Sequence, residues 1–295
     1  MIDQANTLRG LMERRTAAPA AVVHPPETRA RTIAVTSGKG GVGKSSLALN
    51  LAIALSEVHA RVCLLDANLG LGNIDLLCGL NGYWNLSHVV TGARTLPEIA
   101  LDGPAGITVI PGASGLVDAA DCPASAQQDL LQQLEQLEHS YDFLLIDTGT
   151  GIHRSIRQFV TAADQVIVIA TPEPTAIADA YATIKSLAAY ASLDIHVLVN
   201  QVAASEQGQA ILERLQQTTR LFLRRDVKSA GIVPRDPHVA EAVFRRVPFV
   251  LGSPASPATL ALERLARRIK SQSGSQPPRG RFFSRLCSPA EARAA

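Results

Sequence analysis

The chain has 295 residues, 46% of them hydrophobic, and a formal net charge of +2. This length and apolar content support one large core or two small ones, which excludes a disordered protein. The small net charge argues against a dedicated nucleic-acid-binding protein but leaves room for a local basic patch. Four scattered cysteines without a CxxC pair fit neither a disulfide framework nor a zinc site and indicate a reducing compartment.

The first thirty residues differ in composition from those that follow. Residues 1–15 are charged and amphipathic, predict a short helix and lack the apolar centre of a signal peptide. Residues 16–30 are rich in alanine and proline, which is typical of a linker. No apolar run reaches the roughly 20 residues that a membrane-spanning helix needs. We therefore expect a cytoplasmic protein.

Residues 31–270 alternate short apolar runs with longer amphipathic ones. Runs rich in valine and isoleucine predict buried strands: RTIAVT, RVCLLD, ITVIP, DFLLID, QVIVIA, DIHVLVN and AGIVP. Helical patterns cover residues 44–58, 126–138, 175–191 and 207–217. This alternation predicts an α/β fold with a mostly parallel, doubly wound sheet and helices on both faces. Ligands of such sheets bind at the carboxyl ends of the strands.

The nucleotide-binding motif follows the first predicted strand. The stretch GKGGVGKS matches G-x-x-x-x-G-K-[ST], in which glycines turn successive N–H groups toward phosphates at a helix N-terminus. Lys44 should reach the β- and γ-phosphates, and the Ser45 hydroxyl should ligate Mg²⁺. The candidate nucleotide-binding residues are consecutive: Gly38, Lys39, Gly40, Gly41, Val42, Gly43, Lys44, Ser45 and Ser46.

Two aspartates end other apolar strands. Asp147 follows FLLI and Asp66 follows CLL, so both should reach the same edge of the sheet as the phosphate loop. Carboxylates in these places can hold the Mg²⁺ shell, as the Walker B acid does. A single strand-terminal aspartate is often only a turn or helix cap. Two beside a phosphate loop favour a metal site formed by Ser45, Asp66 and Asp147.

The lysine directly after the first glycine sets this loop apart. The stretch KGGVGKS resembles the deviant Walker A motif of the MinD/ParA ATPases, and within them the flagellar-number regulators of the FlhG/FleN type. Supporting stretches are LLDANLGLGNIDLLCGL, GITVIPGASG, LLIDTGTGI and TPEPTAIADAYATIK. The resemblance covers residues 31–270. It implies a P-loop NTPase fold of the SIMIBI, MinD-like type that binds ATP and Mg²⁺ and hydrolyses ATP.

The resemblance also assigns roles to single residues. In this family the extra lysine, here Lys39, reaches across a face-to-face dimer to the partner's ATP, which implies an ATP-dependent homodimer. The catalytic set it implies is Lys39, Lys44, Asp66, Asn68 and Asp147. Asn68 departs from the family, whose switch I usually reads Asp-x-Asp. An amide can position water but cannot take its proton, so hydrolysis should be slow or should depend on Asp66.

Base recognition and partner activation follow from the resemblance as well. Asn200 corresponds to the residue that reads the adenine edge, and Pro234 and Asp236 lie in the segment that packs against the base. At the N-terminus, DQANTLR resembles the DQAxxLR element with which these regulators stimulate the GTPase FlhF. The residues that carry this element are Asp3, Gln4, Leu8 and Arg9, with Gln4 orienting water or phosphate in the partner's site.

The C-terminal residues form a second linker, 271–279, and a tail, 280–295. On a helix, Phe282, Phe283 and Leu286 share one face with Cys287, while Arg281 and Arg285 lie on or near the other. A basic amphipathic segment of this kind suits the surface of an anionic membrane and resembles the membrane-targeting tails of MinD-like proteins. The alternative is a disordered tail that is basic by chance.

Together these features predict a regulatory ATPase switch for flagellar number and placement. We expect it to act with an FlhF-like GTPase, with flagellar C-ring or transcriptional-regulator partners, and at the inner membrane, peripherally, when ATP is bound. The main rivals are a MinD-type division regulator and a ParA-type partitioning protein, which would need a basic surface for DNA. The cysteine spacing disfavours an iron–sulfur carrier, and the lack of tyrosine in the tail disfavours a tyrosine autokinase.

Overall fold

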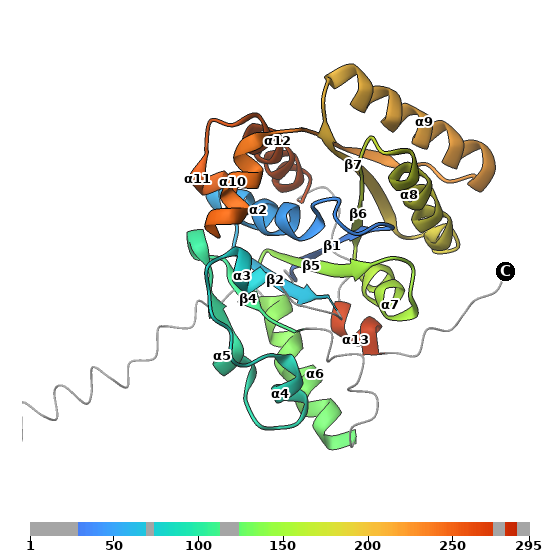
Figure 1. Cartoon of the computed structure of the whole chain (residues 1–295). Coiled ribbons are helices and arrows are strands. Elements are labelled where there is room, and N and C mark those ends of the chain that lie inside the picture. Colours follow the sequence, from blue (N-terminus) through green and yellow to red (C-terminus); the bar gives the residue numbers. More distant parts are fainter. Residues whose placement is uncertain (1–28, 69–73, 113–123, 274–280, 288–295) are drawn as a thin grey trace, which may run out of the picture.

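A computed structural model describes residues 29–68, 74–112, 124–273 and 281–287. They form an eight-stranded sheet covered by helices on both faces (Figure 1), which confirms the predicted α/β fold. The predicted helix of residues 1–15, with Asp3, Gln4, Leu8 and Arg9, lies outside the described residues. So do most of both predicted linkers and the last eight residues of the tail.

The strands follow one another across the sheet in the order β3-β4-β2-β5-β1-β6-β7-β8, which places β1 near the middle. Every adjacent pair is parallel except β3 and β4, which are antiparallel. All seven predicted strands are present, and β3 is an additional edge strand of two residues. The strands are β1 (Arg31–Ser37), β2 (Val62–Ala67), β3 (Leu101–Asp102), β4 (Thr108–Ile110), β5 (Phe143–Thr150), β6 (Gln165–Ala170), β7 (Asp194–Val202) and β8 (Lys228–Pro234).

The four predicted helical segments correspond to α2, α6, α8 and α9, although α9 extends six residues beyond the predicted end. The other helices of the described ranges were not predicted, and most of them are shorter, with α12 the exception. The helices are α2 (Lys44–Glu57), α3 (Ile74–Leu77), α4 (Leu86–Val90), α5 (Leu96–Ile99), α6 (Ala124–Ser140), α7 (Arg154–Ala162), α8 (Pro174–Leu187), α9 (Ser205–Leu223), α10 (Pro237–Arg245), α11 (Phe249–Gly252), α12 (Pro257–Gln272) and α13 (Phe282–Cys287), with a 3₁₀ turn η1 at Pro104–Gly106. Within the described ranges, no helix is both long and apolar enough to cross a bilayer.

The core has two layers because both faces of the sheet are covered. On β1, Ile33 and Val35 pack with α2, α11 and α12, whereas Ala34 faces the layer that includes α6, α7, α8 and α9. All seven residues of β1 are buried, and so are all six of β2 and of β6. This explains why the strand sequences are continuously apolar rather than alternating, as parallel strands buried on both faces should be.

The tail differs from the expectation of a free, membrane-facing segment. Its helix α13 forms as predicted, but Phe282 and Phe283 are fully buried and Leu286 is 7% exposed, in the same core layer as α6 and α7. The two phenyl rings meet edge to face with centroids 5.0 Å apart. Burying an aromatic side chain contributes roughly 1.5–3 kcal/mol, and α6 and α7 supply the apolar surface that a solvated tail would lack. Arg281 stays exposed.

Polar contacts hold α13 in this position. The Phe283 N–H donates to Glu138 Oε1 at 2.9 Å, and the Glu138 carboxylate also pairs with Arg29 at 3.3 Å. Arg285 pairs with Asp164 at 3.3 Å and donates to a backbone carbonyl at the end of α7. Glu138 is 1% exposed, so these contacts satisfy a carboxylate that burial would otherwise penalise. The docked tail is therefore an integral part of the fold in this conformation.

Candidate functional site

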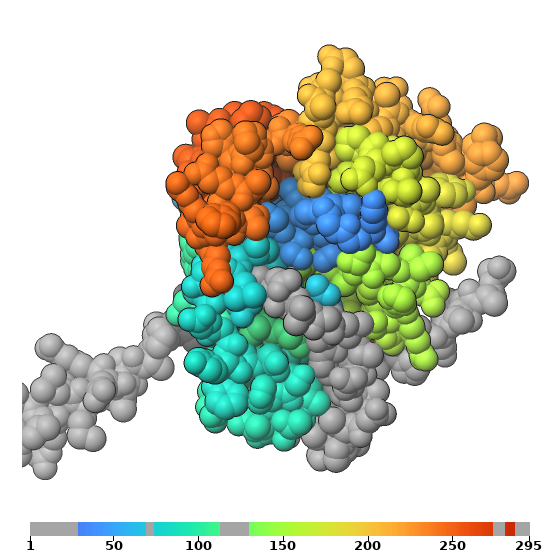
Figure 2. All heavy atoms as spheres, viewed as in Figure 1, coloured from blue at the N-terminus to red at the C-terminus, as the bar shows by residue number. Residues whose placement is uncertain are grey.

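The phosphate loop joins the end of β1 to the first turn of α2, as the motif predicts. Gly41 and Gly43 have φ angles of +79° and +87°, which L side chains rarely adopt. A Cβ on Gly38 would lie 2.4 Å from the carbonyl oxygen of Asp179 in α8, so this position has no room for a side chain. The glycines thus allow both the left-handed turns and the close approach of α8. Figure 2 shows part of the blue segment that contains this loop at the surface, between lobes from other parts of the chain.

Asn200, at the end of β7, fastens the loop. Its Nδ2 donates to the Val42 carbonyl oxygen at 2.8 Å, and a Cβ on Gly43 would lie 2.7 Å from the same nitrogen. The structure therefore brings Asn200 into the nucleotide-binding region, as the sequence predicts. Its contact here is with the loop, and its role as the adenine-edge reader stays a prediction.

Lys44 and Asp147 form a buried ion pair at the centre of the site. Lys44 Nζ lies 2.7 Å from Asp147 Oδ1, and the two side chains are 6% and 1% exposed. Burial raises the pKa of Asp147, and the charge of Lys44 with hydrogen bonds from Lys44 and Ser45 offsets part of the rise. The loop lysine is thus paired, away from solvent, with the carboxylate expected to support Mg²⁺.

Asp66 lies beside Asp147 because β2 and β5 are neighbours and these two residues are in register. Burial and the neighbouring Asp147 carboxylate raise the pKa of Asp66 to about 6, although backbone N–H groups of Asn68 and Ile74 oppose the rise. Those N–H groups donate to Asp66 at 3.1 and 3.3 Å. Two neighbouring buried carboxylates whose pKa values are both raised are suited to a divalent cation.

The donor set fits Mg²⁺ rather than a cation held by protein ligands alone. Three oxygen donors meet at the carboxyl edge of the sheet: the carboxylates of Asp66 and Asp147 and the Ser45 hydroxyl. In the described ranges, no group of three or more His, Cys, Asp or Glu side chains could hold a metal ion by itself. Mg²⁺ characteristically takes one or two carboxylates and completes its shell with phosphate oxygens and water. When bound, the ion would neutralise charge on the terminal phosphates.

Asn68, in switch I, lies against the stretch from Asp147 to Gly151, which the resemblance identifies as switch II. A Cβ on Gly149, two residues after Asp147, would lie 3.5 Å from Asn68 Oδ1. The amide is therefore next to the segment that follows the buried carboxylate, where the family's second switch I acid is expected. The structure brings Lys44, Asp66, Asn68 and Asp147 together, as the sequence predicts.

Lys39 has surroundings that differ from those of Lys44. Its Nζ forms a salt bridge with Glu173 and lies 3.1 Å from Thr175 Oγ1, both at the N-terminal end of α8. The Lys39 side chain is 38% exposed and that of Glu173 is 63% exposed. Neither Glu173 nor Thr175 was predicted from the sequence as a contact of Lys39. The order of the segments could have indicated the contact, because the PEPT stretch follows β6, the neighbour of β1 in the sheet.

The two residues predicted to pack against the base occupy different surroundings. Pro234 lines an open cavity of about 410 Å³ with Val202, Ile232, Leu260 and Arg264, among others. Asp236 caps α10 and also accepts from the backbone N–H of Ala258 at 3.1 Å. Burial would raise the pKa of Asp236, but hydrogen bonds from Ala258 and His238 lower it. The Asp236 carboxylate thus accepts hydrogen bonds from the first turns of both α10 and α12. Pro234, in contrast, borders the open cavity.

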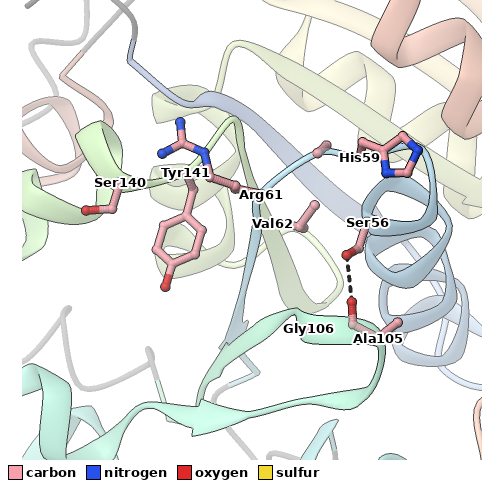
Figure 3. Close-up of a pocket in the computed structure, with 9 residues that line it drawn as sticks. Ser56, His59, Arg61, Val62, Ala105, Gly106, Ser140 and Tyr141 are labelled. Carbon is pink, nitrogen blue, oxygen red and sulfur yellow. Dashed lines mark hydrogen bonds between the residues drawn. The ribbon is translucent and has the colours of Figure 1, made fainter. Parts of the chain in front are cut away.

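A second cavity, of about 450 Å³, lies at the amino ends of β2 and β5, opposite the phosphate loop (Figure 3). Within it, the Ser56 hydroxyl donates to the Ala105 carbonyl oxygen at 2.7 Å (Figure 3). Arg61, which also lines the cavity, pairs with Asp142 at 2.9 Å. Because parallel strands bind ligands at their carboxyl ends, this cavity is not part of the nucleotide site.

Residues 28–270 match a family model, ParA, described as NUBPL iron-transfer P-loop NTPase. The antiactivator FleN of Pseudomonas aeruginosa is 36% identical over 268 residues, which span 90% of this chain and 94% of FleN. The chain belongs to the ParA/MinD family of P-loop NTPases. As a member of this ParA/MinD family it is an ATPase that binds a nucleotide and Mg²⁺.

Other relatives lie in the flagellar and division branches of the ParA/MinD family. The flagellum site-determining protein YlxH of Helicobacter pylori is 37% identical over 183 residues, 62% of each chain. The MinC:MinD cell division protein complex of Aquifex aeolicus contains a chain with a TM-score of 0.67 and 27% identity, covering 83% of this chain and 97% of that one.

The position of Asn68 predicts a slow ATPase. We expect Asn68→Asp to raise the rate of ATP hydrolysis by about tenfold or more, because a carboxylate beside switch II can accept a proton from the attacking water. Phosphate release at saturating ATP·Mg²⁺ measures the rate. Asn85→Asp, at the half-buried N-cap of α4, is the matched control and should leave the rate unchanged. An unchanged rate in Asn68→Asp would show that this position does not limit hydrolysis.

Proposed function

We propose that this ParA/MinD-family ATPase is an ATP-dependent dimerising switch that regulates the number and placement of flagella. The similarity to FleN over nearly the full length of both chains supports the flagellar branch, and YlxH supports it over a shorter stretch. A MinD-type role in division is the second candidate, since MinD of Bacillus subtilis is 30% identical over 82% of this chain. The DQANTLR element favours the flagellar role.

The exposure of Lys39 is the observation that supports dimerisation. Lys44 is buried against Asp147 and is placed to serve the nucleotide of its own subunit. Lys39 lies in the same loop but at the surface, with Glu173 as its partner. Exposed ion pairs of this kind are worth little, so Glu173 can release the lysine when a stronger anion approaches. The phosphates of ATP bound to a second copy are such an anion.

Dimerisation should follow the nucleotide. We expect ATP with Mg²⁺ to give a dimer and ADP to leave a monomer, as measured by light scattering after size exclusion. Lys39→Ala should abolish the ATP-dependent dimer and lower hydrolysis by about a hundredfold or more, as loss of a charge acting in trans does. Its affinity for nucleotide as a monomer should change little. Lys185→Ala, at an exposed position of α8, is the control. Equal dimerisation in ADP and ATP would contradict this switch.

The N-terminal element is the basis for a proposed partner. Asp3, Gln4, Leu8 and Arg9 match the motif that stimulates FlhF, so we propose an FlhF-like GTPase as the partner of residues 1–15. Adding the full chain should stimulate GTP hydrolysis by that GTPase. Gln4→Ala should remove the stimulation, while Gln128→Ala, a glutamine elsewhere in the chain, should retain it. Stimulation that survives Gln4→Ala would contradict this assignment. C-ring components or a transcriptional regulator are further proposed partners.

The tail supports a reversible, peripheral contact with the inner membrane. Because Phe282, Phe283 and Leu286 are buried, this contact requires α13 to leave the α6–α7 surface. Its neighbour α7 begins shortly after the switch II segment that ends β5, so nucleotide-dependent movement of switch II can reach the docked helix. In a dimer, two weak tails would act together through avidity.

Co-sedimentation with anionic vesicles tests the role of the tail. The full chain should pellet more in ATP than in ADP, and a chain that ends at Ser273 should lose this difference. Both proteins should dimerise equally in ATP, because the tail lies outside the nucleotide site. An ATP-dependent increment of the same size in the shortened chain would refute a membrane role for the tail.

Cys63 and Cys78, the two cysteines whose surroundings the structure describes, argue against an iron-transfer function, although the matching family model has that description. Cys63 is fully buried in β2, and burial raises the pKa of its thiol. Burial and the Asp75 carboxylate raise the pKa of Cys78 to about 12. Metal binding needs thiolates, which these surroundings disfavour.

A further inference from the structure

A set of large apolar side chains is exposed on α3, on and just after α10, and on α11. Phe244 on α10 is the most exposed of them, at 90%, and Leu76 on α3 is 44% exposed. One exposed apolar side chain is ordinary, but several that adjoin mark a surface that another molecule covers. We call this set the α3–α11 surface, and it consists of Leu76, Val243, Phe244, Val247 and Leu251.

The three helices form one continuous surface. A Cβ on Gly79, just after α3, would lie 3.4 Å from the carbonyl oxygen of Arg246, the cap of α10. Leu77 of α3 lines the same small cavity as Val247. A Cβ on Gly252, at the end of α11, would lie 3.4 Å from Val247 Cγ1. The exposed apolar side chains therefore belong to neighbouring segments, although α3 and α10 are far apart in the sequence.

The end of α9 exposes another apolar pair, but at the opposite edge of the sheet. Leu221 and Phe222 are 73% and 70% exposed. Arg225, just after α9, donates to the carbonyl oxygen of Leu193, the residue before β7. The end of α9 thus lies at the amino end of its strand, whereas α3 and α10 follow the carboxyl ends of β2 and β8. Of these two apolar surfaces, it is the α3–α11 surface that shares the edge of the phosphate loop.

The α3–α11 surface also borders the nucleotide site directly. Ser46, in the first turn of α2, lines the same small cavity as Val243 and Val247. Ile74, the first residue of α3, donates its N–H to Asp66 Oδ2 at 3.3 Å. Figure 2 shows the orange lobe that contains α10 beside the blue segment that contains the loop, on one face of the molecule. A molecule that covers the loop from this side therefore meets the α3–α11 surface as well.

The charges around the surface favour a protein as its occupant. The charged residues nearest to it in the chain are of both signs, and Arg245 pairs with Glu241 on the same helix at 2.9 Å. Asp75 and Arg246 add one charge of each sign, so the four charges cancel. An anionic membrane or a nucleic acid would call for an excess of basic side chains. An apolar centre with a mixed polar rim is typical of protein interfaces.

A second copy of the chain is the protein that this position favours. In the proposed switch, Lys39 leaves Glu173 for the phosphates bound to a second copy, so that copy lies against the loop. One exposed lysine cannot hold two copies together by itself. A stable interface typically buries about 800 Å² on each partner and has an apolar centre. The α3–α11 surface offers apolar area of this kind next to the loop.

We propose that the α3–α11 surface forms the apolar part of the interface between two copies of the chain in ATP. The inference rests on the proposed switch and adds to it the side chains that hold the dimer together. Lys39 makes the association depend on the triphosphate, and burial of the apolar side chains adds the affinity that one charged contact lacks.

Variants of the full chain locate the interface. Val243→Ser with Phe244→Ser should raise the dissociation constant of the dimer in ATP·Mg²⁺ about thirtyfold, the effect of losing a buried aromatic anchor. Leu76→Ser should raise it about tenfold. Analytical ultracentrifugation over a range of protein concentrations measures the constant. The matched control is Leu221→Ser with Phe222→Ser, an exposed pair at the other edge of the sheet, which should dimerise as the wild type does.

Two further measurements separate a lost interface from a damaged protein. The unfolding temperature and the affinity of the monomer for ADP should stay at the wild-type values, because the changed side chains are exposed. ATP hydrolysis per subunit should need about thirtyfold more of the Val243→Ser, Phe244→Ser protein to reach half of its plateau, since the rate follows the fraction of dimer.

The outcomes distinguish this inference from the switch on which it rests. A wild type that stays monomeric in ATP would overturn both. A wild type that dimerises in ATP, with an α10 variant of the same dissociation constant, would overturn this inference alone and leave the surface to another protein. Equal weakening by the α9 control would overturn it too, because the loss would not be specific to the α3–α11 surface.

Discussion

The ion pair between Lys44 and Asp147 is the interaction on which the nucleotide site depends. It connects the first turn of α2 to β5, so the phosphate loop and the switch II strand share one buried contact. Removing one partner from such a pair leaves an uncompensated buried charge, which typically costs about 3–5 kcal/mol. The lysine and the carboxylate can therefore separate only when each finds another partner. A nucleotide with Mg²⁺ supplies both, phosphate for Lys44 and the cation for Asp147.

The same reasoning separates the two lysines of the loop. Burial commits Lys44 to its own subunit, whereas Lys39 is at the surface in a weak pair with Glu173. One loop thus holds a buried lysine that keeps its partner and an exposed lysine that can exchange its partner for another anion. Asp66 adds a third charged group, since its pKa of about 6 reflects burial and then repulsion from Asp147, and a divalent cation would relieve that repulsion. In the proposed switch, nucleotide, metal and a second copy would act on a single network of charges.

The opposite helical layer gathers the two ends of the described chain. Glu138 contacts both Arg29, where the chain enters the domain, and the backbone N–H of Phe283 in the docked tail. Arg285 contacts Asp164, which in turn accepts from the N–H of Thr32 at the start of β1, at 2.8 Å. Arg29 and the docked tail are thus both held beside α6 and α7. In the proposed switch, the tail would be linked to the nucleotide site through α7 and β5.

The sequence by itself determined the features that depend on local pattern. Continuously apolar runs predicted seven strands, and the spacing of Gly38, Gly43 and Lys44 predicted the loop, because these signals lie within about ten residues of one another. Tertiary structure decided the contacts between distant segments. Asn200 holds Val42, Glu173 holds Lys39, and α13 buries the face that its amphipathic pattern alone would have assigned to a membrane. An amphipathic pattern predicts that one face of a helix will be covered. Only the packing of the other helices determines whether protein or membrane covers it.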